Sequence, residues 1–409
     1  MDSWTPEKRV ITTLSHEEPD RIPIHEGSIE IPELAQSTTP LNYKPGLLFM
    51  PYEITRLLTT SWFQSFRKTF FKILNKPIVL EPFIKTTFNQ TTWLFRKYGV
   101  DLMGYTAGVP MIFSDKLFTD FYVDKLKRRV MGPHNNIVTE LPSNDRGGAV
   151  QRNGFLNGPE DYERYMKFDP DHLGNYFLLP KILKIAEGKI AFMFYIHGAA
   201  FFEMMSDMFG FVTLFRLLVK NRSFIKKVVK DLNDYACSVA QHLLERGVRL
   251  FYMGDDLGLK GKGIISPRMY KEYFHDSIKK FTQIVHDKGG FIIRHSCGYF
   301  KEYIPFFQQE HIDGLHPWES SAGMDIFEGK QKWGDQFTLV GNVPIGMLSH
   351  SSRKEIRDYV LKLIRECGPG GGYIAASSHS IVPSCKWDNY LTMLWTLKKY
   401  GKYPIELSK

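Results

Sequence analysis

The sequence is poor in cysteine and has no long apolar run. Its 409 residues include four cysteines, too few and too scattered for a disulfide framework, which predicts a reduced protein of the cytoplasm. The apolar stretches have the length of a strand and not of a membrane span, and charges interrupt the first segment, where a signal peptide would be apolar. These absences predict a cytoplasmic chain with no membrane partner.

Basic residues are not concentrated in any one tract. Lys and Arg number 53 against 44 Asp and Glu, which gives a formal net charge of +9. Because these residues are spread along the chain, without an arginine-rich tract or the spacing of a zinc finger, we expect no nucleic-acid partner. The excess of positive charge indicates a general bias towards anionic partners.

A glycine-rich phosphate loop is missing as well. The first predicted strand is followed by His25-Glu-Gly-Ser, and no Gly-Lys-Ser/Thr follows the glycine run at 368–372. A doubly wound open sheet would need such a loop after its first strand, so the sequence disfavours that fold.

Short apolar runs alternate with amphipathic helical stretches through most of the chain. Helical spacing is clearest over 224–244, 267–286 and 353–367. The predicted strands are 22–24, 101–105, 190–196, 250–253, 291–294, 314–318, 338–341 and 373–376. Eight strands that alternate with helices predict an α/β protein with a (β/α)8 barrel.

The whole chain, 1–409, is expected to form a single barrel domain. An N-terminal strand and helical cap are predicted over about 1–98, with helical spacing over 54–74, and the main barrel over about 99–409. A hairpin-like insertion is predicted over 118–146, where two short apolar pairs flank a Gly-Pro turn.

Residues that carry chemistry gather at the predicted strand ends, where the active site of such a barrel is built. His295 and Cys297 leave the fifth strand two residues apart, so their side chains point the same way and can converge on one metal ion. His379 follows the last strand and is the predicted third ligand, with Cys385 as the alternative. Nitrogen and sulfur ligands with one open position are typical of catalytic zinc. A metal-free polar core is the other interpretation.

Carboxylates and other polar groups occur at the same strand ends. Asp256 and Glu319 are the predicted catalytic groups, each as a further metal ligand or as a holder of a substrate oxygen. A turn for Asp256 and a loop backbone for Glu319 are the structural alternatives. The predicted substrate-binding residues are Glu26, Tyr105, His197 and Asn342. For His197, as for His316, a hydrogen-bonded core residue is the alternative.

Taken in order, these residues resemble the uroporphyrinogen decarboxylase superfamily, and more closely its corrinoid-dependent methyltransferase branch. The similarity spans nearly the whole chain and implies a (β/α)8 barrel, in agreement with the alternation above. The segments that carry it are Arg9-Val-Ile-Thr-Thr-Leu14, Glu18-Pro-Asp-Arg-Ile-Pro-Ile24, Gly254-Asp-Asp-Leu-Gly258, His295-Ser-Cys-Gly298, Gly341-Asn-Val343 and Ser378-His-Ser-Ile381.

The decarboxylases of this superfamily carry an arginine-rich motif shortly after the first strand, which holds the propionates of the tetrapyrrole. Here residues 26–33 contain no arginine, and the next one along the chain is Arg56. A substrate with several carboxylates would lack its cationic clamp, which argues against porphyrinogen decarboxylation.

In the coenzyme M methyltransferases of the superfamily, an H-x-C pair and a later cysteine bind zinc, which activates a thiolate. His295 and Cys297 match the pair, whereas His379 stands in the place of the later cysteine. Because histidine brings no negative charge, this set would leave the ion a stronger Lewis acid, which suits an ether oxygen. The segments 316–325 and 399–404 also resemble the branch that demethylates aryl methyl ethers in anaerobes.

The resemblance therefore implies a methyltransferase that moves a methyl group from a methoxylated aromatic compound to the Co(I) corrinoid of a partner protein, in methanogenesis or acetogenesis. The expected cofactors are zinc and the corrinoid carried by that cobalamin-binding partner. The alternatives are a methylcorrinoid:thiol methyltransferase, a decarboxylase-like lyase and a non-catalytic module that binds the corrinoid protein. We expect the basic stretch 67–97, with Lys68 and Lys72, to contact the partner. Homodimers occur among relatives, and the sequence does not decide this point.

Overall fold

The computed structural model describes most of the chain from residue 201 onwards and shorter pieces before it. The described residues are 4–27, 29, 92–107, 122–124, 129–131, 137–140, 150–151, 153–172, 176, 179–196, 199 and 201–405. The predicted helix over 54–74, most of the basic stretch 67–97 and His197 lie outside them.

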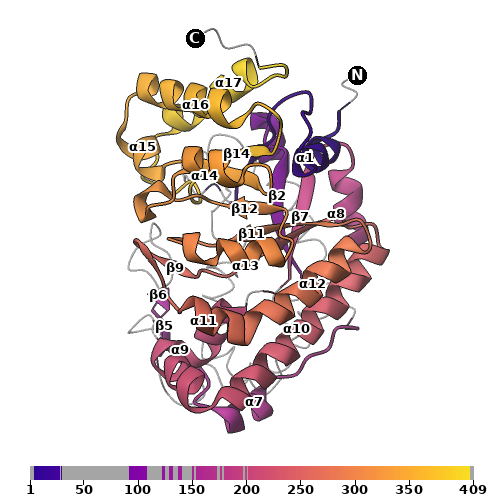
Figure 1. Cartoon of the computed structure of the whole chain (residues 1–409), viewed down its shortest axis with the longest axis vertical. Coiled ribbons are helices and arrows are strands. Elements are labelled where there is room, and N and C mark those ends of the chain that lie inside the picture. Colours follow the sequence, from indigo (N-terminus) through magenta and orange to yellow (C-terminus); the bar gives the residue numbers. More distant parts are fainter. Residues whose placement is uncertain are drawn as a thin grey trace.

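Eight parallel strands close into a barrel, which confirms the predicted fold (Figure 1). Each predicted strand corresponds to one strand of the barrel, with small shifts at the ends. In the order in which they pair, the strands are β1 (Ile24–His25), β14 (Tyr373–Ser377), β13 (Thr338–Val343), β12 (Gly314–His316), β11 (Phe291–His295), β8 (Leu250–Met253), β7 (Ala191–Ile196) and β2 (Leu102–Ala107), which pairs again with β1.

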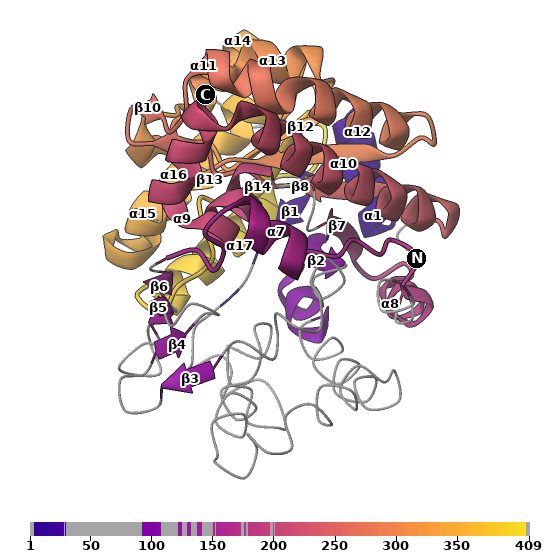
Figure 2. The ribbon, with the colours of Figure 1, turned by 90° about the horizontal axis from the view of Figure 1, so that it is seen from below.

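Helices surround the barrel, and α10 and α12 run side by side along one flank of it (Figure 2). The described helices are α1 (Pro6–Leu14), a helix at 92–98, α7 (Pro159–Tyr165), α8 (Leu179–Ala186), α9 (Phe201–Lys220), α10 (Arg222–Glu245), α11 (Pro267–Tyr270), α12 (Asp276–His286), α13 (Ile304–Gln309), α14 (Ile326–Trp333), α15 (Ile345–His350), α16 (Arg353–Cys367) and α17 (Trp387–Tyr400). A π-helical turn joins α11 to α12, so the predicted helix over 267–286 is continuous. None of the described helices is both long and apolar enough to cross a membrane.

The first helix closes one end of the barrel. Val10 and Leu14 of α1 are buried in a cluster with the inward-facing side chains of several strands, among them Leu250, Ile293 and Val340. These residues alternate with outward-facing ones along each strand, as the pleat of a strand requires. The apolar cluster fills the barrel at the amino ends of its strands, which leaves the carboxyl ends for polar groups.

The insertion after β2 is a small sheet and not a simple hairpin. It contains β3 (Tyr122–Asp124), β4 (Arg129–Met131), β5 (Ile137–Glu140) and β6 (Val150–Gln151). The predicted apolar pairs at 122–123 and 137–138 lie in β3 and β5, but β4 lies between them and pairs with both. β4 follows a run of basic residues and holds two apolar residues, so its apolar pattern is too short to indicate a strand.

The alternation of side chains along the strands also determines which polar residues at the mouth of the barrel point into it. On β11, Ile293 and His295 share one face while Arg294 takes the other, where Phe307 of α13 and Tyr270 of α11 pack against its guanidinium. His316 lies beside His295 because the two residues are in register between β12 and β11. The barrel interior therefore ends in a layer of histidines.

Candidate metal centre

Among the residues that the structure describes, one group of potential metal ligands lies at the carboxyl ends of β8 and β11. Asp256, His295 and Cys297 offer an oxygen, a nitrogen and a sulfur atom that all lie within 4.8 Å of one another. Nε2 of His295 lies 3.1 Å from Sγ of Cys297 and 3.1 Å from Oδ1 of Asp256. The two residues of the predicted H-x-C pair thus do converge, and a carboxylate joins them.

This donor set fits a zinc ion. Zinc binds nitrogen and carboxylate oxygen at about 2.0–2.1 Å and thiolate at about 2.3 Å, so two ligands of a tetrahedral ion lie roughly 3.3–3.6 Å apart. A small outward movement of the three side chains would reach that geometry. Each of them is half-buried, which leaves one side of the group accessible to a substrate.

Two loops meet closely to build the group. The N–H of Cys297 donates to Oδ1 of Asp256 over 2.9 Å, which ties the loop after β11 to the loop after β8. Gly298 has a φ of +78°, and a Cβ at this position would lie 2.4 Å from the carbonyl carbon of Gly258. Only glycine allows both this backbone conformation and this approach.

The pKa of the Asp256 carboxyl and that of the Cys297 thiol are shifted in opposite directions. Burial alone would raise the pKa of Asp256, but the hydrogen bond and the charge of His295 outweigh it and lower the pKa to about 2. Burial and the charge of Asp256 raise the pKa of Cys297. The thiol therefore keeps its proton in the absence of a cation, and a metal ion would have to displace that proton to bind.

Aromatic and imidazole rings form the floor beneath the group. The ring of Tyr252 lies 5.7 Å from that of His295 and 6.1 Å from that of Tyr195. His316 and His25 meet edge to face at 5.3 Å, and both are buried. Burial lowers the pKa of His25 to about 4 and that of His316 well below its usual value, so both rings are neutral near pH 7.

The site also contains a carboxyl that the strand-end argument missed. Glu203 lies in the first turn of α9, and burial followed by the charges of Asp256, Asp255 and Asp207 raises its pKa well above the usual value. Its carboxyl also raises the pKa of Cys297, which places it near the metal group. Because it belongs to a helix and not to a strand end, no sequence signal distinguished it from a surface glutamate.

Asp255, next to the candidate ligand Asp256, has a structural role. Its Oδ1 accepts hydrogen bonds from the N–H groups of Phe202 and Glu203, at 2.8 and 3.0 Å. It thereby caps the amino end of α9, a frequent role of an aspartate side chain.

The other predicted residues lie at the mouth but not in the metal group. Glu319 accepts from the N–H of Gly298 at 3.1 Å, and so binds a loop backbone. Asn342 is buried, with its amide donating to the carbonyl of Trp318 and accepting from the hydroxyl of Tyr359. The substrate-related roles of both residues stay predictions.

The predicted residues at the ends of β1 and β14 also lie outside the metal group. Glu26 is fully buried and accepts a 2.6 Å hydrogen bond from the hydroxyl of Ser377, and burial raises its pKa to about 8.

His379 is exposed and is not one of the three converging residues, so its role as a ligand stays a prediction. Cys385 is buried and contacts Ser349. Tyr105 lies on β2, but its side chain is outside what the structure describes.

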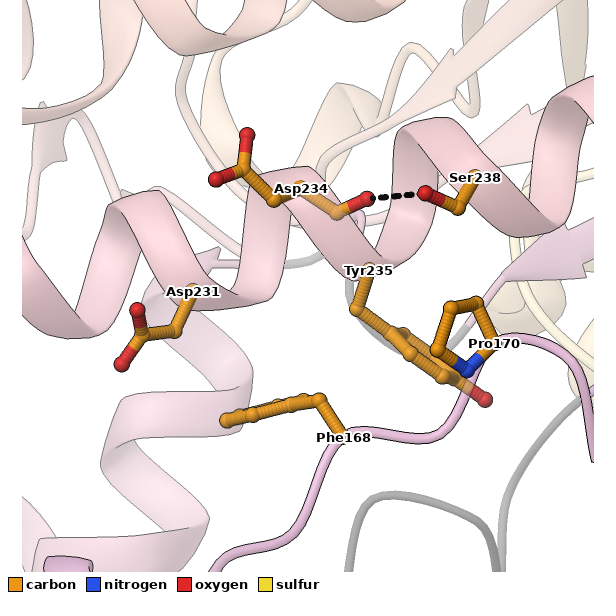
Figure 3. A pocket seen from close by; sticks show the side chains of 6 residues that line it. All are labelled: Phe168, Pro170, Asp231, Asp234, Tyr235 and Ser238. Carbon is orange, nitrogen blue, oxygen red and sulfur yellow. Dashed lines mark hydrogen bonds between the residues drawn. The ribbon is translucent and has the colours of Figure 1, made fainter.

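A shallow groove on the outer face of α10 is unrelated to these groups (Figure 3). It has a volume of about 240 Å³ and lies between α10 and the segment at 168–170. Its two carboxylates are engaged, Asp231 with Lys227 and Asp234 with Lys230 and Lys280. None of the residues at the strand ends lines it, so it does not belong to the candidate site.

Comparison with solved structures finds the same fold in a methyltransferase from Methanosarcina mazei. The two chains are 14% identical, the match covers 97% of this chain and 99% of that one, and the TM-score is 0.63. A D-psicose 3-epimerase with D-tagatose from Clostridium cellulolyticum H10 matches at 9% identity over 78% of this chain and 94% of that one, with a TM-score of 0.41. This second likeness is too distant to carry an argument.

Comparison of the sequence with curated proteins and with family models identifies the family of this chain. No curated protein sequence matches the chain. The family model described as uroporphyrinogen decarboxylase (URO-D) matches residues 141–400, which is more than half of the chain and includes β8, β11, β12, β13 and β14. The predicted resemblance is thereby confirmed at the level of the family, and the chain belongs to the uroporphyrinogen decarboxylase family.

Proposed function

We propose that this chain is an enzyme that transfers a methyl group from a methoxylated aromatic compound to the Co(I) corrinoid of a partner protein. The observation that carries the proposal is the convergence of Asp256, His295 and Cys297 at the open end of the barrel. A carboxylate, an imidazole and a thiolate are a donor set that zinc accepts. The fold likeness to a methyltransferase is consistent with the proposal.

The reaction requires help at the leaving oxygen. The bond between methyl carbon and ether oxygen breaks as the bond between cobalt and carbon forms, and the electron pair remains on the oxygen as a phenolate. A zinc ion held by Asp256, His295 and Cys297 would supply a Lewis acid that stabilises this developing charge. The chain orients the ether, because its three ligands are fixed by β11 and by the contact between the loops after β8 and β11.

The aromatic rings near the group suit an aryl substrate. Tyr252 and Tyr195 lie next to each other on neighbouring strands, and Tyr252 packs against His295. Offset or edge-to-face contacts between such rings and a methoxyarene would place its ether oxygen above the metal group. The corrinoid protein would then have to approach over the mouth of the barrel, with the basic stretch 67–97 as the proposed contact.

The lyase alternative rests on the family name and is less well supported. A tetracarboxylate substrate needs several cationic partners, and the segment after the first strand contains no arginine up to Arg56. Near the metal group, Arg294 faces away from the barrel interior and is fully buried. A thiol methyltransferase is the nearer alternative, since it would use the same metal ligands in the opposite direction.

The test is a visible-spectrum assay with the purified zinc-loaded chain, Co(I) cobalamin or a corrinoid protein, and a panel of methoxybenzenes. We expect loss of the Co(I) band and growth of a methyl-Co(III) spectrum with at least one methoxyarene, and no reaction with the His295→Ala variant. Consumption of methyl-Co(III) by a thiol would instead indicate the thiol methyltransferase. No reaction in either direction would overturn the proposal and favour the lyase or the binding module.

A further inference from the structure

His316 is the residue that contacts the candidate ligand His295 on the side away from the metal group. Nδ1 of His316 lies 2.7 Å from Nδ1 of His295, which is a short hydrogen-bond distance. The contact follows from the barrel itself, because the two residues are in register on β11 and β12 and their rings lie 5.0 Å apart.

The two sides of the His295 ring face different neighbours. Asp256 and Cys297 approach Nε2, whereas His316 approaches Nδ1. A cation on Nε2 requires the lone pair of that nitrogen, so the proton of the neutral ring must then reside on Nδ1. Among the residues that the structure describes, the acceptor for the Nδ1–H of His295 is the Nδ1 lone pair of His316, which must then carry its own proton on Nε2.

The surroundings of His316 leave its ring little freedom to turn. It is buried, with the ring of His25 edge to face at 5.3 Å on one side. The hydroxyl of Tyr252 lies 3.2 Å from the same Nδ1 and can donate to it. Tyr252 is thus able to share Nδ1 of His316 as an acceptor with His295, which is compatible with the tautomer that His295 needs.

We propose that His316 is a positioning residue that fixes the tautomer and the orientation of His295 for metal binding. Ligating histidines commonly donate their second N–H to a carboxylate or a backbone carbonyl, which adds to the basicity of the ring. Here the acceptor is an uncharged imidazole. It would orient His295 without passing negative charge to it, and so would not lower the Lewis acidity of a bound ion.

The inference rests on the proposed metal centre and not on the identity of the methyl donor, so metal binding tests it directly. The metal-free full-length chain is titrated with Co²⁺, whose visible absorption reports both affinity and ligand geometry. The variants are His316→Asn, whose amide oxygen can take the place of Nδ1, and His316→Leu, which has no acceptor. His286→Asn is the matched control, because His286 pairs with Asp313 at the opposite end of the barrel.

We expect His316→Leu to weaken Co²⁺ binding by about 10- to 100-fold, the usual effect of losing an outer partner of a ligating histidine. His316→Asn should recover most of the loss with an unchanged spectrum, and His286→Asn should match the wild type. Circular dichroism of the metal-free variants checks that each is folded.

Two outcomes would overturn the inference while the metal centre stands. Wild-type affinity and spectrum in His316→Leu would show that the contact does not position His295. An equal loss in both His316 variants, with a spectrum that indicates one ligand fewer, would make His316 a ligand itself. A wild-type chain that binds no Co²⁺ would instead refute the proposed metal centre, and this inference with it.

Discussion

Arg294 and Asp255 face each other behind the metal group, with Nη2 of the arginine 4.0 Å from Oδ2 of the aspartate. Each precedes a candidate ligand in the sequence, Arg294 before His295 and Asp255 before Asp256. Both side chains are fully buried, and these two atoms have no hydrogen-bond partner in the described structure. Each of these buried side chains thus precedes a candidate metal ligand in the sequence but does not itself belong to the metal group.

Removal of Asp255 should be strongly destabilising. Asp255→Ala removes the cap of α9 and one of the two carboxylates beside Arg294, which keeps Glu310, already the nearer of the two at 3.7 Å. Loss of one partner of a buried pair costs about 3–5 kcal/mol of unfolding free energy when the other charge is left uncompensated, and because Arg294 keeps Glu310 we expect a cost at the lower end of this range. Asp255→Asn, which keeps an oxygen for the cap, should cost less. Urea unfolding measures both.

The matched control for this prediction is Asp234→Ala, because Asp234 of α10 pairs with two exposed lysines, Lys230 of α10 and Lys280 of α12. Its loss should cost no more than about 1 kcal/mol, as for other surface ion pairs. If Asp255→Ala were no less stable than this control, the buried pair would not contribute to stability as described.

Much of the fold could be predicted because the spacing of apolar residues and their position along the chain indicate the helices and strands. The eight strands follow from apolar runs between helical stretches, and a strand-like alternation continued two residues past His295, the last residue of β11, predicts that Cys297 points the same way. The small sheet in the insertion was harder to predict from the sequence, since β4 has two apolar residues beside a basic run. A pattern of that length does not indicate a strand.

The site could be predicted only in part, because loops and not strands complete it. Asp256 joins His295 through the hydrogen bond that its carboxylate accepts from the backbone of Cys297. That contact depends on the close approach of two glycines, Gly258 and Gly298, which sequence spacing does not reveal. His379 had the right residue type at the right strand end, but its side chain is exposed.

The ligand set itself can be tested by zinc content. We expect Asp256→Ala, His295→Ala and Cys297→Ala each to lower zinc affinity by more than about 100-fold, a greater loss than that of an outer partner. His379→Ala should retain zinc, because His379 lies outside the converging group. Elemental analysis after dialysis against a weak chelator measures the bound metal. Loss of zinc in His379→Ala together with retention in Asp256→Ala would restore His379 as the third ligand.

The buried carboxyl of Glu26 predicts a pH dependence of stability. Its pKa is raised from 4.5 to about 8 in the folded chain, so between these values the folded state holds a proton that the unfolded state releases. The free energy of unfolding should therefore fall as the pH rises from about 4.5 to 8, by on the order of 4 kcal/mol, and then level off. The Glu26→Gln variant cannot ionise and should escape this loss.

Thermal unfolding at a series of pH values measures the effect. The difference in melting temperature between Glu26→Gln and the wild type should grow from pH 5 to pH 8. Glu366→Gln, at an exposed position on α16, is the control and should follow the wild type throughout. A constant difference between Glu26→Gln and the wild type across this range would mean that Glu26 ionises in the folded chain as easily as in the unfolded one.

The contact between the two loops gives the last prediction. A Cβ at Gly298 would overlap the backbone of Gly258 and would require a positive φ of an alanine. The conformation alone costs about 1–2 kcal/mol, and the overlap adds a similar amount. We expect Gly298→Ala to lose roughly 2–4 kcal/mol of unfolding free energy and to bind Co²⁺ more weakly, because Cys297 must move. Gly346→Ala in α15, where a Cβ would meet no atom within 4 Å, should be neutral or slightly stabilising in the same measurements. Wild-type stability together with wild-type Co²⁺ binding in Gly298→Ala would show that the loops after β8 and β11 are not held together as the structure has them.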